Sequence, residues 1–149
     1  MNKILGIIKT LALKCWLRCI SSERYVKYLR KHGIKIGNNV KFRYPAHTLI
    51  DLNRPSLIEF GDNIDINDNF SLLVHDFGAY VLRGKYKEFI NSSGKVKIGN
   101  NVVFGRNVTV LKGVEIGDNT VVALGSVVTK SAPPQLCNSG DSCKSYLYA

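Results

Sequence analysis

The sequence is short of several features that mark whole classes of protein. It has four cysteines in 149 residues, none in a Cys-x-x-Cys pair and none grouped with histidine at the spacing of a zinc site. Its apolar N-terminal stretch is interrupted by Lys9 and Lys14, so it is too short and too charged to span a bilayer. That stretch also lacks the clean apolar core and cleavage site of a secretory signal. We therefore expect a cytoplasmic protein without a bound metal.

Acidic residues are scarce in the first 35 residues, where nine basic residues face one acid, Glu23. This segment carries +8 of the net charge of +10, and the rest of the chain is close to neutral. The charge is not accompanied by a nucleic-acid-binding motif, so no nucleic-acid partner is expected.

Apolar residues alternate with the basic ones in residues 1–35, which predicts two amphipathic helices. The second begins near Ser22, with Ser21 or Ser22 as its N-cap, and ends near His32. Two interpretations stay open. The segment caps the rest of the fold, or residues 1–20 lie on the inner face of the membrane as a peripheral helix.

The second half of the chain has a six-residue apolar period. The positions are Ile98, Phe104, Val110, Ile116, Val122 and Val128. A period of six fits neither an α-helix nor an alternating strand, and a β-sandwich of regular strands does not hold it. It is the period of a parallel β-helix, in which three hexapeptides form one coil and stacked residues lie about 18 positions apart. We therefore expect Ile116 to stack on Ile98 and Val122 on Phe104.

The units themselves fit the corners and interior of a narrow prism. Four of them read apolar-Gly-Asn/Asp-Asn, at 36–39, 60–63, 98–101 and 116–119. Glycine, Asn and Asp tolerate tight corners and positive φ better than other residues. Small or β-branched residues follow four positions after each leading apolar residue, at Val102, Val108, Val114, Thr120 and Ser126. We expect both sets to alternate in the core.

The period also sets the domain boundaries. Phe60, Ile66 and Leu72 share one phase, but Ile98 follows Leu72 by 26 residues, which is not a multiple of six. We therefore predict that residues 76–95 loop out of the coil. The organisation expected is a basic helical segment over 1–35, a β-helix over 36–134 with weaker coils before Phe60, and a tail over 135–149.

His75 is the candidate catalytic residue. It lies at the end of the first regular block and directly before the predicted loop. A neutral imidazole can take the proton of a hydroxyl that attacks a thioester and then return it to the leaving thiolate. A surface histidine at a corner is the alternative, and the repeat context favours catalysis. His32 and His47 lack that context and are expected to be structural.

Residues 94–134 resemble the second half of bacterial sugar O-acetyltransferases of the maltose, galactoside and capsular polysaccharide type. Leu73-Val74-His75-Asp76 is similar to their histidine-containing segment. The resemblance implies an all-β, left-handed parallel β-helix and a homotrimer with active sites between subunits. It implies acetyl-CoA as co-substrate and O-acetylation of a sugar hydroxyl in surface polysaccharide biosynthesis. Two alternatives stay open: another acceptor, such as serine or an amino sugar, or an inactive scaffold.

The same resemblance implies the contacts to CoA. Carried over onto this sequence, they are Arg106, Leu124, Thr129 and Lys130. Lys130 would pair with a phosphate as a point charge. Leu124 stands where these enzymes usually have alanine, and a larger side chain that points outward there narrows the groove for the pantetheine arm.

The tail from Gln135 onward departs from the resemblance. In place of the usual Ala-Gly-Xaa-Pro-Ala-Lys-Val-Ile ending, this chain reads QLCNSGDSCKSYLYA. Permitted codons for this stretch, read one base out of frame, give the usual ending. The hypothesis is that residues 135–149 are a frameshift product that lacks the adenine-side contacts, and a divergent tail is the alternative.

Overall fold

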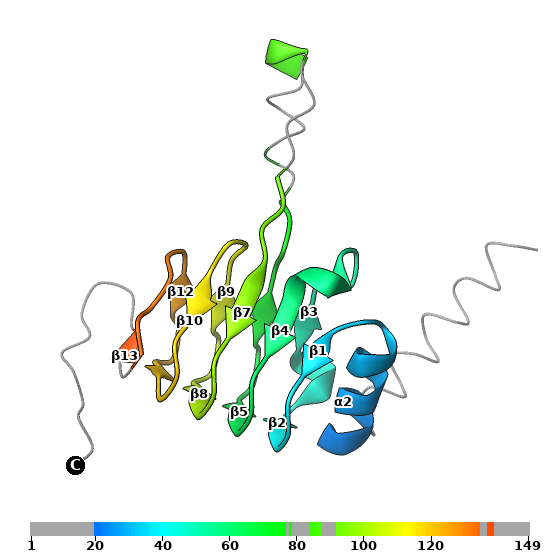
Figure 1. Ribbon diagram of the computed structural model, residues 1–149, viewed down its shortest axis with the longest axis vertical. Helices are drawn as coiled ribbons and strands as arrows, with labels where there is room; N and C mark the ends of the chain where they lie inside the picture. Colours follow the sequence, from blue (N-terminus) through cyan, green and yellow to red (C-terminus); the bar gives the residue numbers. More distant parts are fainter. Residues whose placement is uncertain (1–19, 77, 79–83, 88–91, 135–136, 139–149) are drawn as a thin grey trace, which may run out of the picture.

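Three parallel sheets form the sides of a prism, the architecture of a left-handed β-helix (Figure 1). The computed structural model describes residues 20–76, 78, 84–87, 92–134 and 137–138. Sheet A contains β1 (Lys35–Ile36), β4 (Ile58–Phe60), β7 (Val96–Ile98) and β10 (Glu115–Ile116). Sheet B contains β2 (Val40–Phe42), β5 (Ile64–Ile66), β8 (Val102–Phe104), β11 (Val121–Val122) and β13 (Cys137–Asn138). Sheet C contains β3 (Leu49–Ile50), β6 (Ser71–Leu72), β9 (Thr109–Val110) and β12 (Val127–Val128).

The chain visits the sheets in the order A, B, C, so each visit to all three completes one coil. Coil 1 is β1–β2–β3, coil 2 is β4–β5–β6, coil 3 is β7–β8–β9 and coil 4 is β10–β11–β12. We call the corners between the sheets edges AB, BC and CA. The three short strands per coil are those that the hexapeptide period predicts.

The register confirms the predicted stacking. Ile116 pairs with Ile98 and Val122 with Phe104, each pair eighteen residues apart. Ile58 pairs with Val96, so coil 2 is 38 residues long. The excess over the regular coil equals the twenty residues of segment 76–95, and in Figure 1 the chain leaves the prism between β6 and β7. Most of this segment, residues 77, 79–83 and 88–91, lies outside the described residues.

The core fills the inside of the prism. All six residues of the apolar series from Ile98 to Val128 are buried, and so are the five smaller residues that alternate with them. The buried hydroxyl of Thr120 donates to the carbonyl of Gly117 at 2.8 Å, which satisfies its hydrogen bond inside the apolar interior.

Edge AB is built from the Gly-Asn/Asp-Asn units. Their Asn and Gly residues have different roles, which the sequence alone does not show. Positive φ falls on the last Asn of each unit, as at Asn101 (56°) and Asn119 (57°). Their amides form a ladder, with Asn101 Nδ2 donating to Asn119 Oδ1 at 2.9 Å. The glycines serve close approach instead: a Cβ on Gly117 would lie 2.4 Å from the nitrogen of Pro134.

Helix α2 (Ser22–Lys31) closes the open end of coil 1, as one of the two interpretations of the basic segment predicts. Ser21 is its N-cap and accepts from Arg24 N. Its buried face of Tyr25, Val26 and Leu29 covers the coil, where Tyr25 meets Phe42 edge-on at 5.0 Å. Burial raises the pKa of the Tyr25 hydroxyl above its usual range.

The remaining predictions from the sequence concern the early coils and the two ends of the chain. The weaker coils before Phe60 contain two 3₁₀ turns, η1 (Pro45–His47) and η2 (Pro55–Leu57). The predicted first helix falls on residues 1–19, which lie outside the described residues, as does the tail apart from β13. β13 pairs with β11 and so continues sheet B. Within the described part of the chain, no helix has both the length and the apolar character that a membrane span requires.

Candidate active site

His75 lies at edge CA and its ring is paired with a carboxylate from the coil before it. It follows β6, and Asp51 follows β3, the strand that pairs with β6 in sheet C. The backbone nitrogen of Asp51 donates to the carbonyl of Leu72 at 3.0 Å, which brings the two chain segments together. The Nδ1 atom of His75 forms a hydrogen bond with Asp51 Oδ2.

Asp51 is held ionised in a buried position. Its side chain is 3% exposed, and besides the His75 ring it accepts the backbone N–H groups of Asn53 at 3.1 Å and Val74 at 3.2 Å. Burial alone would raise the pKa of this carboxyl, but the bonds from Asn53, His75 and Val74 outweigh it, so the pKa lies below its usual range. A negative charge is therefore fixed against one nitrogen of the imidazole.

This pairing determines what the imidazole can do. A carboxylate accepts only, so Nδ1 carries the proton and Nε2 of the neutral ring has the lone pair. When Nε2 takes up a proton, the Asp51 carboxylate stabilises the resulting imidazolium. The His75 side chain is 25% exposed, so solutes reach a ring that is otherwise enclosed. The arrangement is suited to general base and then general acid catalysis.

Sequence reasoning identified His75 but missed Asp51. The two residues are 24 positions apart, whereas the regular coil is eighteen residues long. Ile50 and its partner Leu72 are already 22 residues apart (72 − 50), and this excess over eighteen lies in the turn with η2, between β3 and β4, where the six-residue period does not fix the register. An acidic residue at the end of the strand beneath His75 would have been the signal.

The four residues implied for CoA binding lie on two different edges. Arg106 and Leu124 follow strands β8 and β11 at edge BC, with Gly125 N donating to the carbonyl of Arg106 at 2.8 Å. Thr129 and Lys130 follow β12 at edge CA, the edge of His75. Sheet C separates the two pairs, so a single chain does not bring all four together with His75.

The surroundings of Arg106 differ from those of Lys130. Arg106 forms an ion pair with Asp68 at 2.8 Å, and His47 Nδ1 contacts the same carboxyl at 2.7 Å. The bonds from His47 and Arg106 lower the pKa of Asp68. Leu124 is 76% exposed, so its side chain points outward. This is the orientation in which it would narrow the expected groove for the pantetheine arm of CoA. Thr129 and Lys130 are both exposed.

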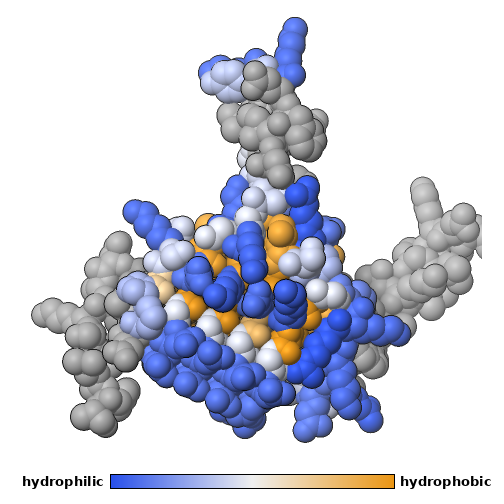
Figure 2. Space-filling model, in the orientation of Figure 1, coloured by the Kyte–Doolittle hydropathy of each residue, from blue (hydrophilic) through white to orange (hydrophobic). Residues whose placement is uncertain are grey.

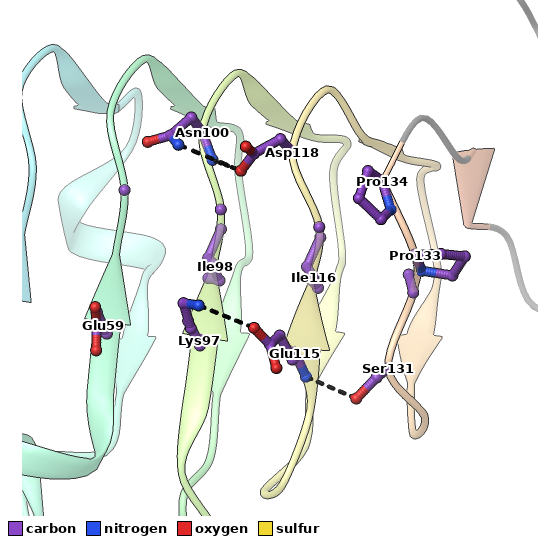
Figure 3. Close-up of a pocket in the computed structure, with 14 residues that line it drawn as sticks. Glu59, Lys97, Ile98, Asn100, Glu115, Ile116, Asp118, Ser131, Pro133 and Pro134 are labelled. Atoms are coloured by element: carbon purple, nitrogen blue, oxygen red, sulfur yellow. Dashed lines mark hydrogen bonds and ion pairs between the residues drawn. The ribbon is translucent and has the colours of Figure 1, made fainter.

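A groove of about 720 Å³ lies over sheet A and edge AB and reaches Ser131, the residue after Lys130 (Figure 3). None of the predicted site residues lines it. Its charged side chains already have partners: Lys97 Nζ meets Glu115 Oε1 at 3.0 Å, Glu59 pairs with Lys95 at 2.8 Å, and Asp118 accepts from the backbone nitrogen of Asn100 at 2.6 Å. Edge CA, with His75 and Asp51, is therefore the candidate site. Among the residues that the structure describes, no three His, Cys, Asp or Glu side chains gather as metal ligands would.

Comparison with known proteins identifies the repeat family. The family described as bacterial transferase hexapeptide (six repeats) matches residues 95–130. Protein CapG of Staphylococcus aureus is 36% identical over 137 residues, which cover 92% of this chain and 76% of CapG. The galactoside O-acetyltransferase of Escherichia coli K12 is 38% identical over 112 residues, 75% of this chain and 52% of that protein. This chain thus spans about half of that enzyme.

Solved structures show the same fold. A maltose O-acetyltransferase from Clostridium difficile 630 superimposes with a TM-score of 0.55 at 26% identity, covering 89% of this chain and 80% of that one. A galactoside acetyltransferase in complex with coenzyme A gives a TM-score of 0.58 at 24% identity, covering 92% and 77%. Fold and sequence together define a hexapeptide-repeat transferase. More narrowly, the chain belongs to the family of hexapeptide-repeat acetyltransferases.

Proposed function

We propose that the protein is an acetyl-CoA-dependent O-acetyltransferase that acts on a sugar hydroxyl in surface polysaccharide biosynthesis. The observation that carries the proposal is the His75–Asp51 pair at an edge of the prism, in which the ring is partly exposed and the carboxylate is buried. The sugar acceptor is supported by the relatives, since two of those compared are a galactoside and a maltose O-acetyltransferase. Serine or an amino sugar as acceptor, and an inactive scaffold, are the alternatives.

In the proposed reaction, His75 moves one proton twice. Nε2 takes the proton of the acceptor hydroxyl while its oxygen attacks the thioester carbon of acetyl-CoA. The new C–O bond forms, the C–S bond then breaks, and the imidazolium returns the proton to the CoA thiolate. The products are an acetyl ester and CoA, with His75 neutral again. Asp51 is the positioning residue, since it holds the ring and balances its charge.

Lys130 is the proposed partner of the CoA phosphates within the same chain as His75. Both residues lie at edge CA, where Lys130 follows β12 and His75 follows β6 in the same sheet. Arg106 and Leu124, at edge BC, would reach the same acetyl-CoA only from a neighbouring copy. The proposed active site therefore lies between subunits.

The outer faces of the sheets support a homotrimer built from sheets B and C. Sheet A presents Lys35, Glu59, Lys97 and Glu115, which pair across neighbouring strands in alternating sign. Figure 2 shows hydrophilic side chains standing over this face. Sheet B instead exposes Val103 and Val121 in coils 3 and 4, next to Lys41 and Asp65 in coils 1 and 2, and sheet C exposes Leu49 and Val127. Exposed apolar faces of this kind mark association surfaces, and a charged face resists association.

The assembly is tested by sedimentation velocity on two matched variants. Val121→Asp places a charge on sheet B and is expected to convert the trimer to a monomer. Lys97→Gln removes a charge from sheet A and is expected to leave the trimer intact. A monomeric parent chain, or equal behaviour of the two variants, would contradict the proposed interface.

The activity is tested by CoA release from acetyl-CoA with a panel of sugars, amino sugars and serine. The expected product is an ester, which hydroxylamine cleaves, whereas the amide of an N-acetylated amino sugar resists. Release with an O-acetylated sugar as product supports the proposal. Release with serine alone, or only an amide product, would favour the second class of acceptor.

Two further parts of the proposal concern the ends of the chain. We propose that the protein acts in the cytoplasm and that residues 1–20 contact the inner face of the membrane. The reason is that basic and apolar residues alternate within this segment. Co-sedimentation with anionic vesicles, compared with a chain that starts at Ile20, tests that contact. The frameshift hypothesis for residues 135–149 is tested by the nucleotide sequence across codons 130–149.

A further inference from the structure

Beside His75, a second polar cluster anchors the two ends of segment 76–95, where the chain leaves the prism. Asp76 directly follows His75, and its Oδ1 accepts from Ser92 Oγ at 2.7 Å. Its Oδ2 forms an ion pair with Lys112 Nζ, which also donates to Ser92 Oγ. We call Asp76, Ser92 and Lys112 the stem clamp, because they join both ends of segment 76–95 to coil 3.

The backbone forms a short antiparallel stem at the same place. Asp76 N donates to the carbonyl of Ser92 at 3.2 Å, and Gly94 N donates to the carbonyl of Val74 at 3.0 Å. His75 lies opposite Ser93 in an antiparallel bridge. A Cβ on Gly94 would lie 2.6 Å from the nitrogen of Gly113, so the returning end packs tightly on the corner that holds Lys112.

His75 is thus held from two neighbouring coils. Asp51 of coil 1 holds its ring, and Lys112 of coil 3 holds the residue that follows it. Lys112 and Lys130 occupy equivalent places in successive coils, because Val110 pairs with Val128 two positions earlier. Lys112 is committed to Asp76, while the equivalent Lys130 is exposed. The hydrogen bonds from Lys112 and Ser92 lower the pKa of Asp76 to about 2, so this carboxyl stays ionised at neutral pH.

We propose that the stem clamp is a positioning device for catalysis, which fixes the main chain at His75 so that Nε2 meets the acceptor hydroxyl. The inference rests on the proposed function of His75. It differs from two other roles for Lys112: a second ligand for the CoA phosphates, and a staple that stabilises the fold without affecting the ring. Small displacements of a catalytic group lower kcat strongly. A positioning role should therefore appear in kcat, a role in binding CoA in KM, and a purely structural role in Tm.

The kinetic test uses Lys112→Met and Asp76→Asn, measured by CoA release on the full-length protein. Both variants are expected to lower kcat by roughly 10- to 100-fold, with KM for acetyl-CoA changed less than about twofold. Lys112→Arg retains the charge and is expected to recover most of the loss. Lys97→Met is the matched control, because Lys97 forms an equivalent ion pair with Glu115 on sheet A, and it is expected to change neither constant.

Two outcomes of these measurements, the second of which also needs the Tm of each variant, would overturn the inference. A raised KM for acetyl-CoA at unchanged kcat would make Lys112 a ligand of CoA. A lowered Tm at unchanged kcat would make the cluster a staple. Ser92→Ala, which removes a hydroxyl and no charge, supplies a second variant if Lys112→Met does not fold.

A second readout does not depend on turnover. The Nδ1–H proton of His75 gives a distinct NMR resonance when it is hydrogen-bonded to Asp51. We expect that resonance to shift in Lys112→Met and Asp76→Asn and to stay in place in Lys97→Met. An unchanged resonance in the first two variants would overturn the inference. A shifted resonance in a protein that releases no CoA with any acceptor would instead count against the proposed function.

Discussion

Two histidine–aspartate pairs flank sheet C, one at each of its edges, and they differ in how the carboxylate is shared. At edge CA, Asp51 pairs with His75 and otherwise accepts only backbone N–H groups among the bonds described. At edge BC, Asp68 pairs with His47 at 2.7 Å and also with Arg106 at 2.8 Å. The same two residue types therefore stand in different electrostatic settings.

Exposure separates the pairs further. His75 is 25% exposed beside a carboxylate that is 3% exposed. His47 is 55% and Arg106 65% exposed around a carboxylate that is 10% exposed. An imidazolium at His75 meets a full, poorly solvated negative charge, whereas at His47 water and Arg106 already screen that charge. The difference is therefore in the charged partners: among the bonds described, the ring is the only side chain that bonds Asp51, whereas Asp68 shares its charge between His47 and Arg106.

The most direct test of the difference between the two pairs is to remove each imidazole ring in turn. His75→Ala is expected to lower kcat for acetyl transfer by roughly 10² to 10⁴-fold, the usual contribution of a general base. His47→Ala is its matched control and is expected to change kcat by less than about threefold, since an exposed ion pair contributes little. CoA release measures both, and calorimetry checks that His75→Ala still binds acetyl-CoA. Equal losses in the two variants would remove the distinction.

Removing the two carboxylates gives the next largest contrast. Asp51→Asn keeps the shape of the side chain but no longer fixes the proton on Nδ1, so we expect a fall in kcat of about 10²-fold. The KM for acetyl-CoA should change little, because Asp51 acts through the ring. The parallel measurement on Asp68→Asn should show kcat within about threefold of the parent. A normal kcat for Asp51→Asn would mean that His75 needs no partner.

The sequence predicted the prism because every coil repeats one environment. Ile98 and Ile116 occupy the same place in successive coils, so the requirement for an apolar side chain recurs with a fixed period. The inserted segment was predictable for the same reason, since it breaks that period by a definite number of residues. Regular stacking makes a local pattern report a global structure.

The partner of His75 could not be predicted, because coils 1 and 2 are irregular. Asp51 reaches His75 across a coil whose register depends on the turn with η2, and no repeat encodes the length of that turn. The division of the CoA residues between two edges was within reach. Arg106 and Leu124 are eighteen residues apart and share an edge, whereas Lys130 follows Leu124 by six residues and lies on the next edge.

The second pair should show its effect in stability rather than in rate. Asp68 connects three coils, with His47 in coil 1 and Arg106 in coil 3, so Asp68→Asn is expected to lower Tm by a few degrees. Because both cations are exposed, we expect the difference from the parent to shrink in 1 M salt. Thermal unfolding followed by circular dichroism at two salt concentrations measures this. A loss of Tm that salt does not affect would show that packing at edge BC, not charge, depends on Asp68.

The smallest effect is expected from acid, and it isolates the carboxylate that follows His75. The pKa of Asp76 is lowered to about 2 by Lys112 and Ser92, so Asp76 remains ionised where an unfolded chain takes up its proton. The stability that this carboxylate contributes is therefore complete above its ordinary pKa and is lost as pH falls through its lowered one. The Tm difference between the parent and Asp76→Asn should stay constant from pH 7 to about pH 5 and shrink between about pH 4 and pH 2. A difference that persists at pH 2 would assign the stabilisation to the uncharged hydrogen bonds of Asp76, and the ion pair with Lys112 would then play no part in holding His75.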